Sequence, residues 1–272
     1  MRSIEARGVP ILMYHSISER RGPTAIPPGV FAAQLEALAD HGFEALPLSS
    51  IVARMRAGEP LPPRSFVLTF DDGYEDFAVH AHGQLAARGY PATVFLPTDK
   101  VGGTADWDGP GAGGAADWDG PAAGAPRIMT WETIRELADA GVAFGSHGAT
   151  HRDLTALPHD ELEAELAASK RAIEERLAGP VTSFAMPYGS TSPAVRRQIG
   201  KVYACAVGTR LERARSGADL FDLPRLDMWY FRDARRWRRF LEGRAEAWLA
   251  ARRALRRLRK LAHSGPLRVV GR

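Results

Sequence analysis

Two adjacent carboxylates, Asp71 and Asp72, follow an apolar run at residues 65–70 and precede Gly73. The run is rich in aromatic and β-branched residues, which is typical of a buried strand. Carboxylates at the end of a buried strand lose hydration, and this is costly unless a metal ion or a proton-transfer role compensates for it. A solvated turn is the simpler interpretation of these three residues alone, so the chemistry depends on partners elsewhere in the chain.

His147 and His151 supply such partners, directly after a short apolar run at residues 142–144. A spacing of four predicts that both imidazoles lie on one face of a helical turn. A single histidine is more often structural, but a pair after a strand is better evidence for a metal site. Two histidines and one carboxylate leave coordination positions open, as a catalytic zinc ion requires. The same set also suits non-haem iron.

Strands and helices alternate along the chain, and this pattern predicts how the polar residues are positioned. Alternation of this kind favours an α/β fold with a parallel sheet or barrel, in which the carboxyl ends of the strands carry the functional site. The predicted strands lie at residues 9–14, 43–46, 65–70, 92–96, 142–144, 182–185, 202–207 and 223–228. The predicted helices lie at about 31–41, 76–88, 130–140, 162–178 and 231–263, and a further helix begins at Ser49 or Ser50 and ends near residue 58. Thr130 is expected to cap the helix at 130–140.

The segment 101–126 differs from its surroundings because it is rich in Gly, Ala and Pro and contains Asp-Trp-Asp-Gly-Pro twice. Two copies are too few to build a repeat architecture, so we expect a long loop inserted into the domain. Long loops in compact domains are often lids or binding loops, and Trp107 or Trp118 could offer a ring face to a sugar. A tolerated insertion is the simpler interpretation of the second copy.

The C-terminal part is strongly basic: residues 231–263 contain twelve basic and three acidic residues, whereas the whole chain carries a net charge of +4. We expect a helical extension at 231–272 that packs on a domain formed by residues 1–230. Its apolar stripe comprises Trp237, Leu241, Trp248, Leu255 and Leu258. The alternative is contact with an anionic surface. Nothing in the sequence is suited to reading bases, so we expect no specific nucleic-acid partner.

The single cysteine, Cys205, excludes an internal disulfide or a thiolate metal cluster. It lies in a strand-like apolar run, where a buried and unreactive thiol is expected. No stretch approaches the length of about 18–20 apolar residues needed for a membrane span, and residues 9–14 are too short for a signal sequence. A cytoplasmic location is therefore expected, although a processed secreted form would have the same features.

Three motifs in order resemble those of the NodB-homology polysaccharide deacetylases. Residues 69–73 (Thr-Phe-Asp-Asp-Gly), 146–151 (Ser-His-Gly-Ala-Thr-His) and 184–189 (Phe-Ala-Met-Pro-Tyr-Gly) are similar to the first, second and third family motifs. The similarity covers roughly residues 9–228, and the three motifs together are highly specific. The resemblance implies a distorted (β/α) barrel.

The resemblance also implies roles for individual residues. Asp72, His147 and His151 would bind a divalent metal, commonly zinc, and Asp71 would be the general base. The backbone N–H of Tyr188, between Pro187 and Gly189, would contribute to an oxyanion hole.

Two departures resemble the poly-N-acetylglucosamine deacetylase branch of the family. Ala185 stands where the family usually has an arginine that braces the base, and the only late Leu-x-His sequence, at 261–263, falls inside the basic helix. In that branch the N-terminal strand would supply the missing element, so His15 would be the general acid. Arg225 and Asp227 would line the rim of the site.

The implied function is hydrolysis of N-acetyl groups on hexosamine units of a poly- or oligosaccharide, with release of acetate. A bound metal would polarise the carbonyl, Asp71 would accept the proton of water, and His15 would protonate the leaving amine. The alternatives are an O-acetyl sugar esterase, an iron oxygenase and a catalytically degenerate carbohydrate-binding protein.

Overall fold

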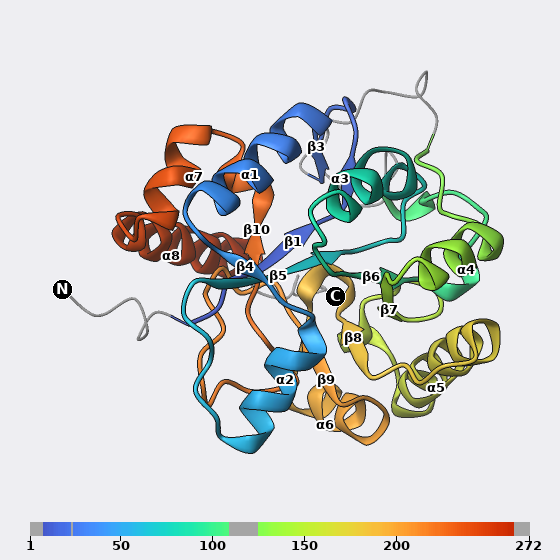
Figure 1. The fold of residues 1–272 in the computed structure, drawn as a ribbon. Helices are drawn as coiled ribbons and strands as arrows, with labels where there is room; N and C mark the ends of the chain where they lie inside the picture. Colours follow the sequence, from blue (N-terminus) through green and yellow to red (C-terminus); the bar gives the residue numbers. More distant parts are fainter. Residues whose placement is uncertain (1–7, 23, 109–124, 264–272) are drawn as a thin grey trace, which may run out of the picture.

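The computed structural model describes residues 8–22, 24–108 and 125–263. Parallel strands form a partial barrel with helices around it (Figure 1). The strands of the main sheet are β1 (Ile11–Tyr14), β4 (Glu44–Ala45), β5 (Ser65–Phe70), β6 (Ala92–Leu96), β7 (Ala143–Ser146), β8 (Ser183–Ala185), β9 (Cys205–Val207) and β10 (Leu226–Asp227). Two further strands, β2 (Ser16–Ile17) and β3 (Ala25–Ile26), form a separate pair.

The order of the strands confirms the predicted α/β barrel. The path runs β10-β1-β5-β6-β7-β8-β9, β4 pairs with β5 beside it, and every pairing is parallel. A parallel bridge between Val207 and Leu223 connects β9 to the segment that leads into β10. The site-bearing strands β10, β1 and β5 are therefore direct neighbours, although their sequences are far apart.

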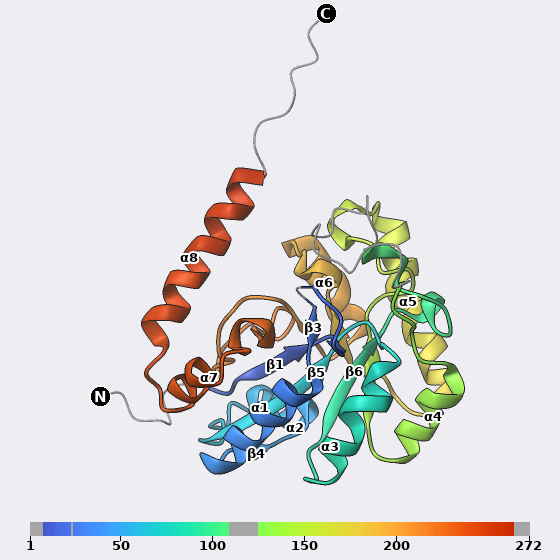
Figure 2. The same cartoon turned by 90° about the horizontal axis from the view of Figure 1, so that it is seen from above.

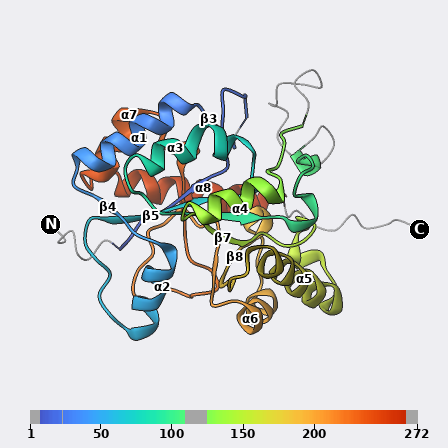
Figure 3. The same ribbon diagram turned by 45° about the vertical axis from the view of Figure 1, so that its right-hand side comes forward.

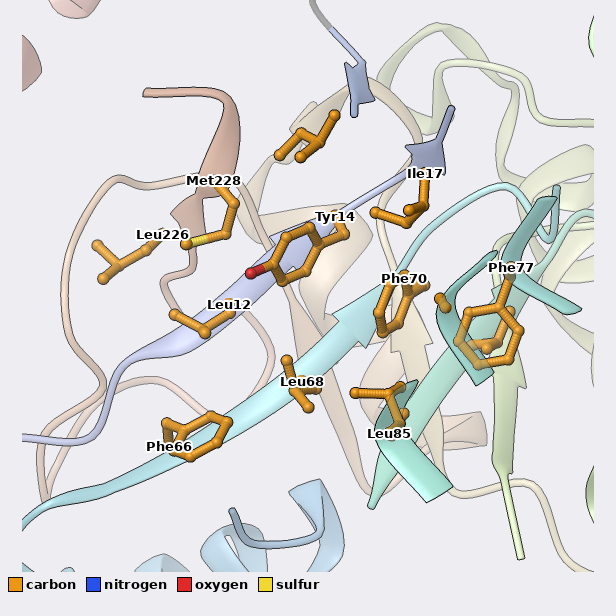
Figure 4. Packing of buried hydrophobic residues seen from close by; sticks show 14 of the residues in the cluster. Leu12, Tyr14, Ile17, Phe66, Leu68, Phe70, Phe77, Leu85, Leu226 and Met228 are labelled. Carbon is orange, nitrogen blue, oxygen red and sulfur yellow. The ribbon is translucent and has the colours of Figure 1, made fainter. Parts of the chain in front are cut away.

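The longer strands β1, β5 and β6 are largely apolar because both of their faces are covered. All six residues of β5 are buried, and Tyr14 of β1 stacks on Phe70 of β5 with ring centroids 5.2 Å apart (Figure 4). The buried Tyr14 hydroxyl donates a hydrogen bond to Gln34 Oε1 at 3.0 Å. This packing holds the carboxyl ends of β1 and β5 side by side.

The helices cover the outside of the strands; α1 and α3 lie on one side of β5 and α2 on the other (Figure 3). They are α1 (Pro28–Asp40), α2 (Leu48–Ala57), α3 (His82–Ala86), α4 (Trp131–Asp139), α5 (His159–Leu177), α6 (Pro193–Val202), α7 (Ala234–Leu241) and α8 (Glu246–His263). Thr130 caps α4 as predicted, since its hydroxyl accepts a hydrogen bond from the Thr133 N–H at 3.2 Å.

Two helix predictions are wrong in detail. The serine cap of α2 is not formed: the helix begins after Pro47, whose φ of −59° already sets the entry, and both serines lie inside the first turn. The single helix expected at 76–88 is a π-helical turn, Phe77–Ala81, followed by the short α3. In neither case is the position of the following strand affected.

The C-terminal part forms two helices rather than the single helix expected. Trp237 in α7 is buried, and its indole N–H donates a hydrogen bond to the Gln34 carbonyl in α1 at 3.0 Å. The far half of α8 stands clear of the barrel (Figure 2), so Leu255 and Leu258 are 51% and 61% exposed. The predicted packing of the apolar stripe is therefore wrong for these two leucines.

No helix in the described part of the chain has the length and apolar character needed to cross a membrane. The cytoplasmic location stays a prediction. Trp118 and the second Asp-Trp-Asp-Gly-Pro copy lie outside the described residues.

Candidate active site

The predicted polar residues meet at the carboxyl ends of neighbouring strands. Parallel strands present these ends at one edge of the barrel, so residues from distant parts of the chain come together there. They follow or end β1 (His15), β5 (Asp71 and Asp72), β7 (His147 and His151), β8 (Pro187, Tyr188 and Gly189) and β10 (Asp227).

Asp72, His147 and His151 form a compact buried cluster. The Nε2 atoms of His151 and His147 lie 3.2 Å and 3.4 Å from Asp72 Oδ1, and one ligand atom from each residue lies within 4.8 Å of the others. Asp72 Oδ1 is buried, and among the described residues it has no hydrogen-bond partner. A cation between the three side chains would satisfy this oxygen, so the residues fit a divalent metal with open coordination positions.

The protein holds His147 in the form that a metal requires. Its Nδ1 lies 2.8 Å from the Ala185 carbonyl, which can only accept a hydrogen bond, so Nδ1 carries the proton and Nε2 presents its lone pair. Without a metal, burial lowers the pKa of His147, but the nearby carboxylates of Asp72 and Asp71 outweigh it, so the pKa is raised. For Asp72 the effects have the opposite signs: burial raises the pKa of this carboxyl, but the two imidazoles lower it well below its usual range.

The helical turn predicted for the two histidines is wrong. Residues 147–151 form a loop whose backbone enters the left-handed region at Gly148 (φ 82°) and His151 (φ 62°). The loop is anchored on α5, because the Thr150 N–H donates a hydrogen bond to Glu165 Oε1 at 2.7 Å. The imidazoles meet, with centroids 4.9 Å apart, through this loop rather than through a helix face.

Left-handed backbone recurs at the site in residues other than glycine. Asp72 (φ 70°), His151 (φ 62°) and Tyr188 (φ 58°) are three of the five such residues in the described part of the chain. Each costs about 1–3 kcal/mol unless the surroundings enforce it. The strained backbone at these three positions therefore lowers the stability of the fold, and it sets the directions of the three side chains.

Arg225 does not line the rim of the site, because its side chain is fully buried behind Asp71. Its Nη1 and Nη2 donate to Asp71 Oδ1 and Oδ2 at 2.6 Å and 2.7 Å, and its Nε donates to the Gly208 carbonyl at 2.8 Å. Burial raises the pKa of Asp71, but Arg225, with smaller contributions from His147 and His15, lowers it overall. Arg225 thus provides the guanidinium that the sequence lacks at Ala185. An arginine inside an apolar strand-like run was the only sequence signal for it.

His15 and Asp227 follow or end the strands β1 and β10, which lie next to each other beside β5. His15 Nε2 is 3.8 Å from Asp71 Oδ2, and the side chain is 21% exposed. Asp227 is half-buried and accepts a hydrogen bond from the Trp229 N–H at 3.1 Å. Burial raises the pKa of Asp227, and the nearby positive charges only partly offset this.

Tyr188 and Trp107 flank His151. The Tyr188 ring is 52% exposed and its centroid lies 4.9 Å from that of His151. Gly189 has no room for a side chain, because a Cβ there would lie 2.1 Å from Thr209 Oγ1. Trp107 is buried and stacks on His151, with centroids 4.1 Å apart, so its ring supports a candidate ligand rather than standing open to a sugar as expected.

The family model for polysaccharide deacetylase matches residues 58–204, which contain Asp71, Asp72, His147, His151 and Tyr188. The chain belongs to the polysaccharide deacetylase family. Membership in the family and the (β/α) barrel expected from the motifs are therefore confirmed.

The curated relatives are similar over part of their length. YxkH of Bacillus subtilis (strain 168) is 26% identical over 181 residues, which cover 66% of this chain and 57% of YxkH. The poly-β-1,6-N-acetyl-D-glucosamine N-deacetylase of Escherichia coli (strain K12) is 30% identical over 101 residues, covering 37% of this chain and 14% of that enzyme.

Solved structures share the fold. IcaB from Ammonifex degensii superposes with a TM-score of 0.69 at 23% identity and covers 86% of this chain and 98% of that one. The Streptococcus pyogenes deacetylase PplD gives a TM-score of 0.66 at 23% identity, covering 81% of this chain and 92% of PplD.

Proposed function

We propose that the protein is a metal-dependent hydrolase that removes N-acetyl groups from hexosamine units of a poly- or oligosaccharide and releases acetate. The observation that carries this proposal is the division of labour between two adjacent carboxylates. Asp72 faces two imidazoles as a metal ligand would, whereas Asp71 is held by Arg225 through both oxygens. The name of the E. coli relative, an N-deacetylase, supports the choice of an amide substrate.

Asp72, His147 and His151 would hold the ion, and zinc suits this set of two histidines and one carboxylate. A bound zinc ion supplies a Lewis acid and lowers the pKa of water toward neutrality. The lowered pKa of Asp71 keeps this carboxylate ionised, so it can accept a proton from the attacking water. Arg225 orients the carboxylate but is too deeply buried to touch a substrate.

The remaining groups act on the substrate. The backbone N–H of Tyr188 would donate to the developing oxyanion, and loss of one such donor typically costs about 10²–10³ in rate. His15, 3.8 Å from Asp71, would protonate the leaving amine through Nε2. An amine needs this proton before it can leave, whereas an alkoxide from an ester needs it less. The Tyr188 ring would form a wall of the substrate cleft.

The first test is acetate release from N-acetylglucosamine oligomers by the parent protein, with a chelator and after zinc is restored. We expect activity that disappears with the chelator and returns with zinc. Asp71→Asn should retain one bound zinc ion and lose turnover. Near-normal turnover in Asp71→Asn would overturn the role of Asp71 as the base.

The alternative hydrolase reaction, on O-acetyl sugars, is separated by the His15→Ala variant. We expect this variant to lose more activity on the N-acetyl oligomer than on an O-acetylated sugar. Equal losses on both would contradict the acid role. The absence of an arginine at position 185 is the feature that favours a catalytically degenerate site. We favour catalysis because Arg225 makes a bidentate contact with Asp71.

A further inference from the structure

A cavity of about 230 Å³ lies between α8 and the loops that follow β8 and β9. One of its walls is Gly189, the neighbour of Tyr188, so the cavity borders the candidate active site. Arg253 and Arg256 reach it from α8. Pockets for whole small molecules usually measure about 300–1,000 Å³, so this one suits a single small group rather than a sugar ring.

The cavity has one positive charge more than it has negative charges. Three arginines and two carboxylates line it: Arg210, Arg253, Arg256, Glu212 and Asp222. Glu212 pairs with Arg253, whose Nε lies 3.5 Å from Glu212 Oε1, and Asp222 pairs with Arg210 at 3.8 Å. Both carboxylates of the cavity therefore already face an arginine other than Arg256. Arg256 forms no ion pair with any carboxylate in the described part of the chain.

Two residues that line this cavity, Arg256 and Thr191, each have a buried hydrogen-bond donor without a partner in the described part of the chain. Arg256 Nη1 and Thr191 Oγ1 are both inaccessible to solvent and have no hydrogen-bond partner among the described residues. Unsatisfied buried groups are uncommon and costly, most of all when they are charged. One ligand with several acceptor oxygens would satisfy both, and its negative charge would compensate Arg256.

Arg256 is also coupled to the catalytic side of the barrel. Its guanidinium lies 5.7 Å from the centroid of the Tyr230 ring, beside the end of β10. Its positive charge lowers the pKa of Asp227, and that of His15 acts in the same direction. A group bound at Arg256 would therefore lie at the edge of the cleft that holds the acetylated sugar, and not on a remote surface.

We propose that this cavity is an anion subsite, and that the preferred substrate is an acetylated saccharide with a phosphate or carboxylate group close to the acetylated sugar. This inference rests on the proposed function and specifies the substrate class. It also gives the basic helix α8 a defined role, because two of its arginines form one wall of the subsite.

The kinetic test compares three substrates: a neutral N-acetylglucosamine tetramer, the same tetramer with a 1-phosphate, and a tetrasaccharide of alternating N-acetylglucosamine and glucuronic acid. We expect kcat/KM to be at least about tenfold higher for one of the anionic substrates, and the preferred one identifies the group. In Arg256→Gln, the ratio of anionic to neutral kcat/KM should fall about 10- to 100-fold, mainly through KM. Thr191→Val should reduce the ratio less.

The matched control is Arg238→Gln, which removes the same charge from an exposed position on α7, outside the cavity. It should leave the ratio at the parent value. An equal fall in both arginine variants would indicate general electrostatic attraction and would overturn the subsite. A parent enzyme without preference for either anionic substrate would overturn it as well.

A binding measurement separates this inference from the proposed function. The full chain, treated with a chelator, is titrated with N-acetylglucosamine 1-phosphate, N-acetylglucosamine and inorganic phosphate by calorimetry. We expect the sugar phosphate to bind more tightly than the neutral sugar, and Arg256→Gln to lose this difference. Equal affinities in parent and variant would overturn the subsite. Absence of acetate release from every substrate would instead count against the proposed function.

Discussion

The strand-end site and the C-terminal helices are both rich in charge, but they hold it in different ways. At the strand ends, Asp71, Asp72 and Arg225 are buried and oppose fixed partners. On α8 the charges lie near the surface, where Arg252 covers the rings of Trp248 and Tyr230. The first arrangement needs neighbouring strands, whereas the second needs one helix and a few loops.

The difference indicates where change is tolerated. Breaking a buried ion pair leaves an uncompensated charge and costs about 3–5 kcal/mol, whereas an exposed pair contributes about 0–1 kcal/mol. The groups proposed for chemistry therefore lie where substitution is most damaging. The arginines proposed for substrate choice lie where a single side chain can change without loss of the fold.

The largest expected effect is at Arg225. Arg225→Met leaves Asp71 buried without its partner and should lower the free energy of unfolding by about 3–5 kcal/mol, measured by denaturant titration. Arg225→Lys keeps a charge but loses the bidentate geometry, so it should fall between the parent and Arg225→Met. Parent-like stability of Arg225→Met would show that the strand-end charges are no more tightly coupled than those of α8.

The two C-terminal helices should respond differently to loss of an apolar side chain. Trp237→Ala in α7 removes a buried ring and should cost about 3–5 kcal/mol of unfolding free energy. Leu258→Ala in α8 removes an exposed side chain and should change it by less than about 0.5 kcal/mol. Thermal and denaturant unfolding of both variants give the two changes in unfolding free energy. A large loss in Leu258→Ala would mean that α8 is packed along its whole length.

Trp107 should affect metal affinity through His151. Trp107→Ala removes the ring stacked on this imidazole, so we expect metal binding to weaken, by at most about 10- to 100-fold, the range typical for loss of an outer-shell hydrogen-bond partner. Trp107→Phe should restore most of the affinity because it keeps a ring face. Competition with a chromophoric zinc chelator gives the constants. Trp131→Ala, on α4, is the control; if it weakened zinc binding equally, the effect would not be specific to the stack.

The smallest effect is expected at Cys205. Burial raises the pKa of this thiol to about 12, so the thiolate forms only as the pH approaches that value. At pH 8 the folded protein should resist maleimide over hours, and the unfolded chain should react within minutes. Mass spectrometry of the maleimide-labelled protein measures the rate of both reactions. Fast labelling of the folded protein would contradict the expected inert thiol.

Features that depend on the local order of residues could be predicted from the sequence. Apolar runs of strand length, with glycines at the turns after them, predicted the main strands, the α/β class and the position of Asp71 and Asp72 at a strand end. Three motifs in order indicated the family and the Asp–His–His set. These inferences succeed because burial on both faces and tight turns leave direct traces in residue type and spacing.

Contacts between segments far apart in the chain could not be predicted, because they depend on how the strands and helices pack. Arg225 meets Asp71 across 154 positions because β10 and β5 both flank β1, and neither strand specifies its neighbour. The Ala185 carbonyl orients His147 through a backbone atom that has no sequence signature. The path of α8 past the rim, which brings Arg256 to its cavity, depends on the turn after α7. Periodicity along a chain shows which face of an element is apolar, but only packing decides what that face meets.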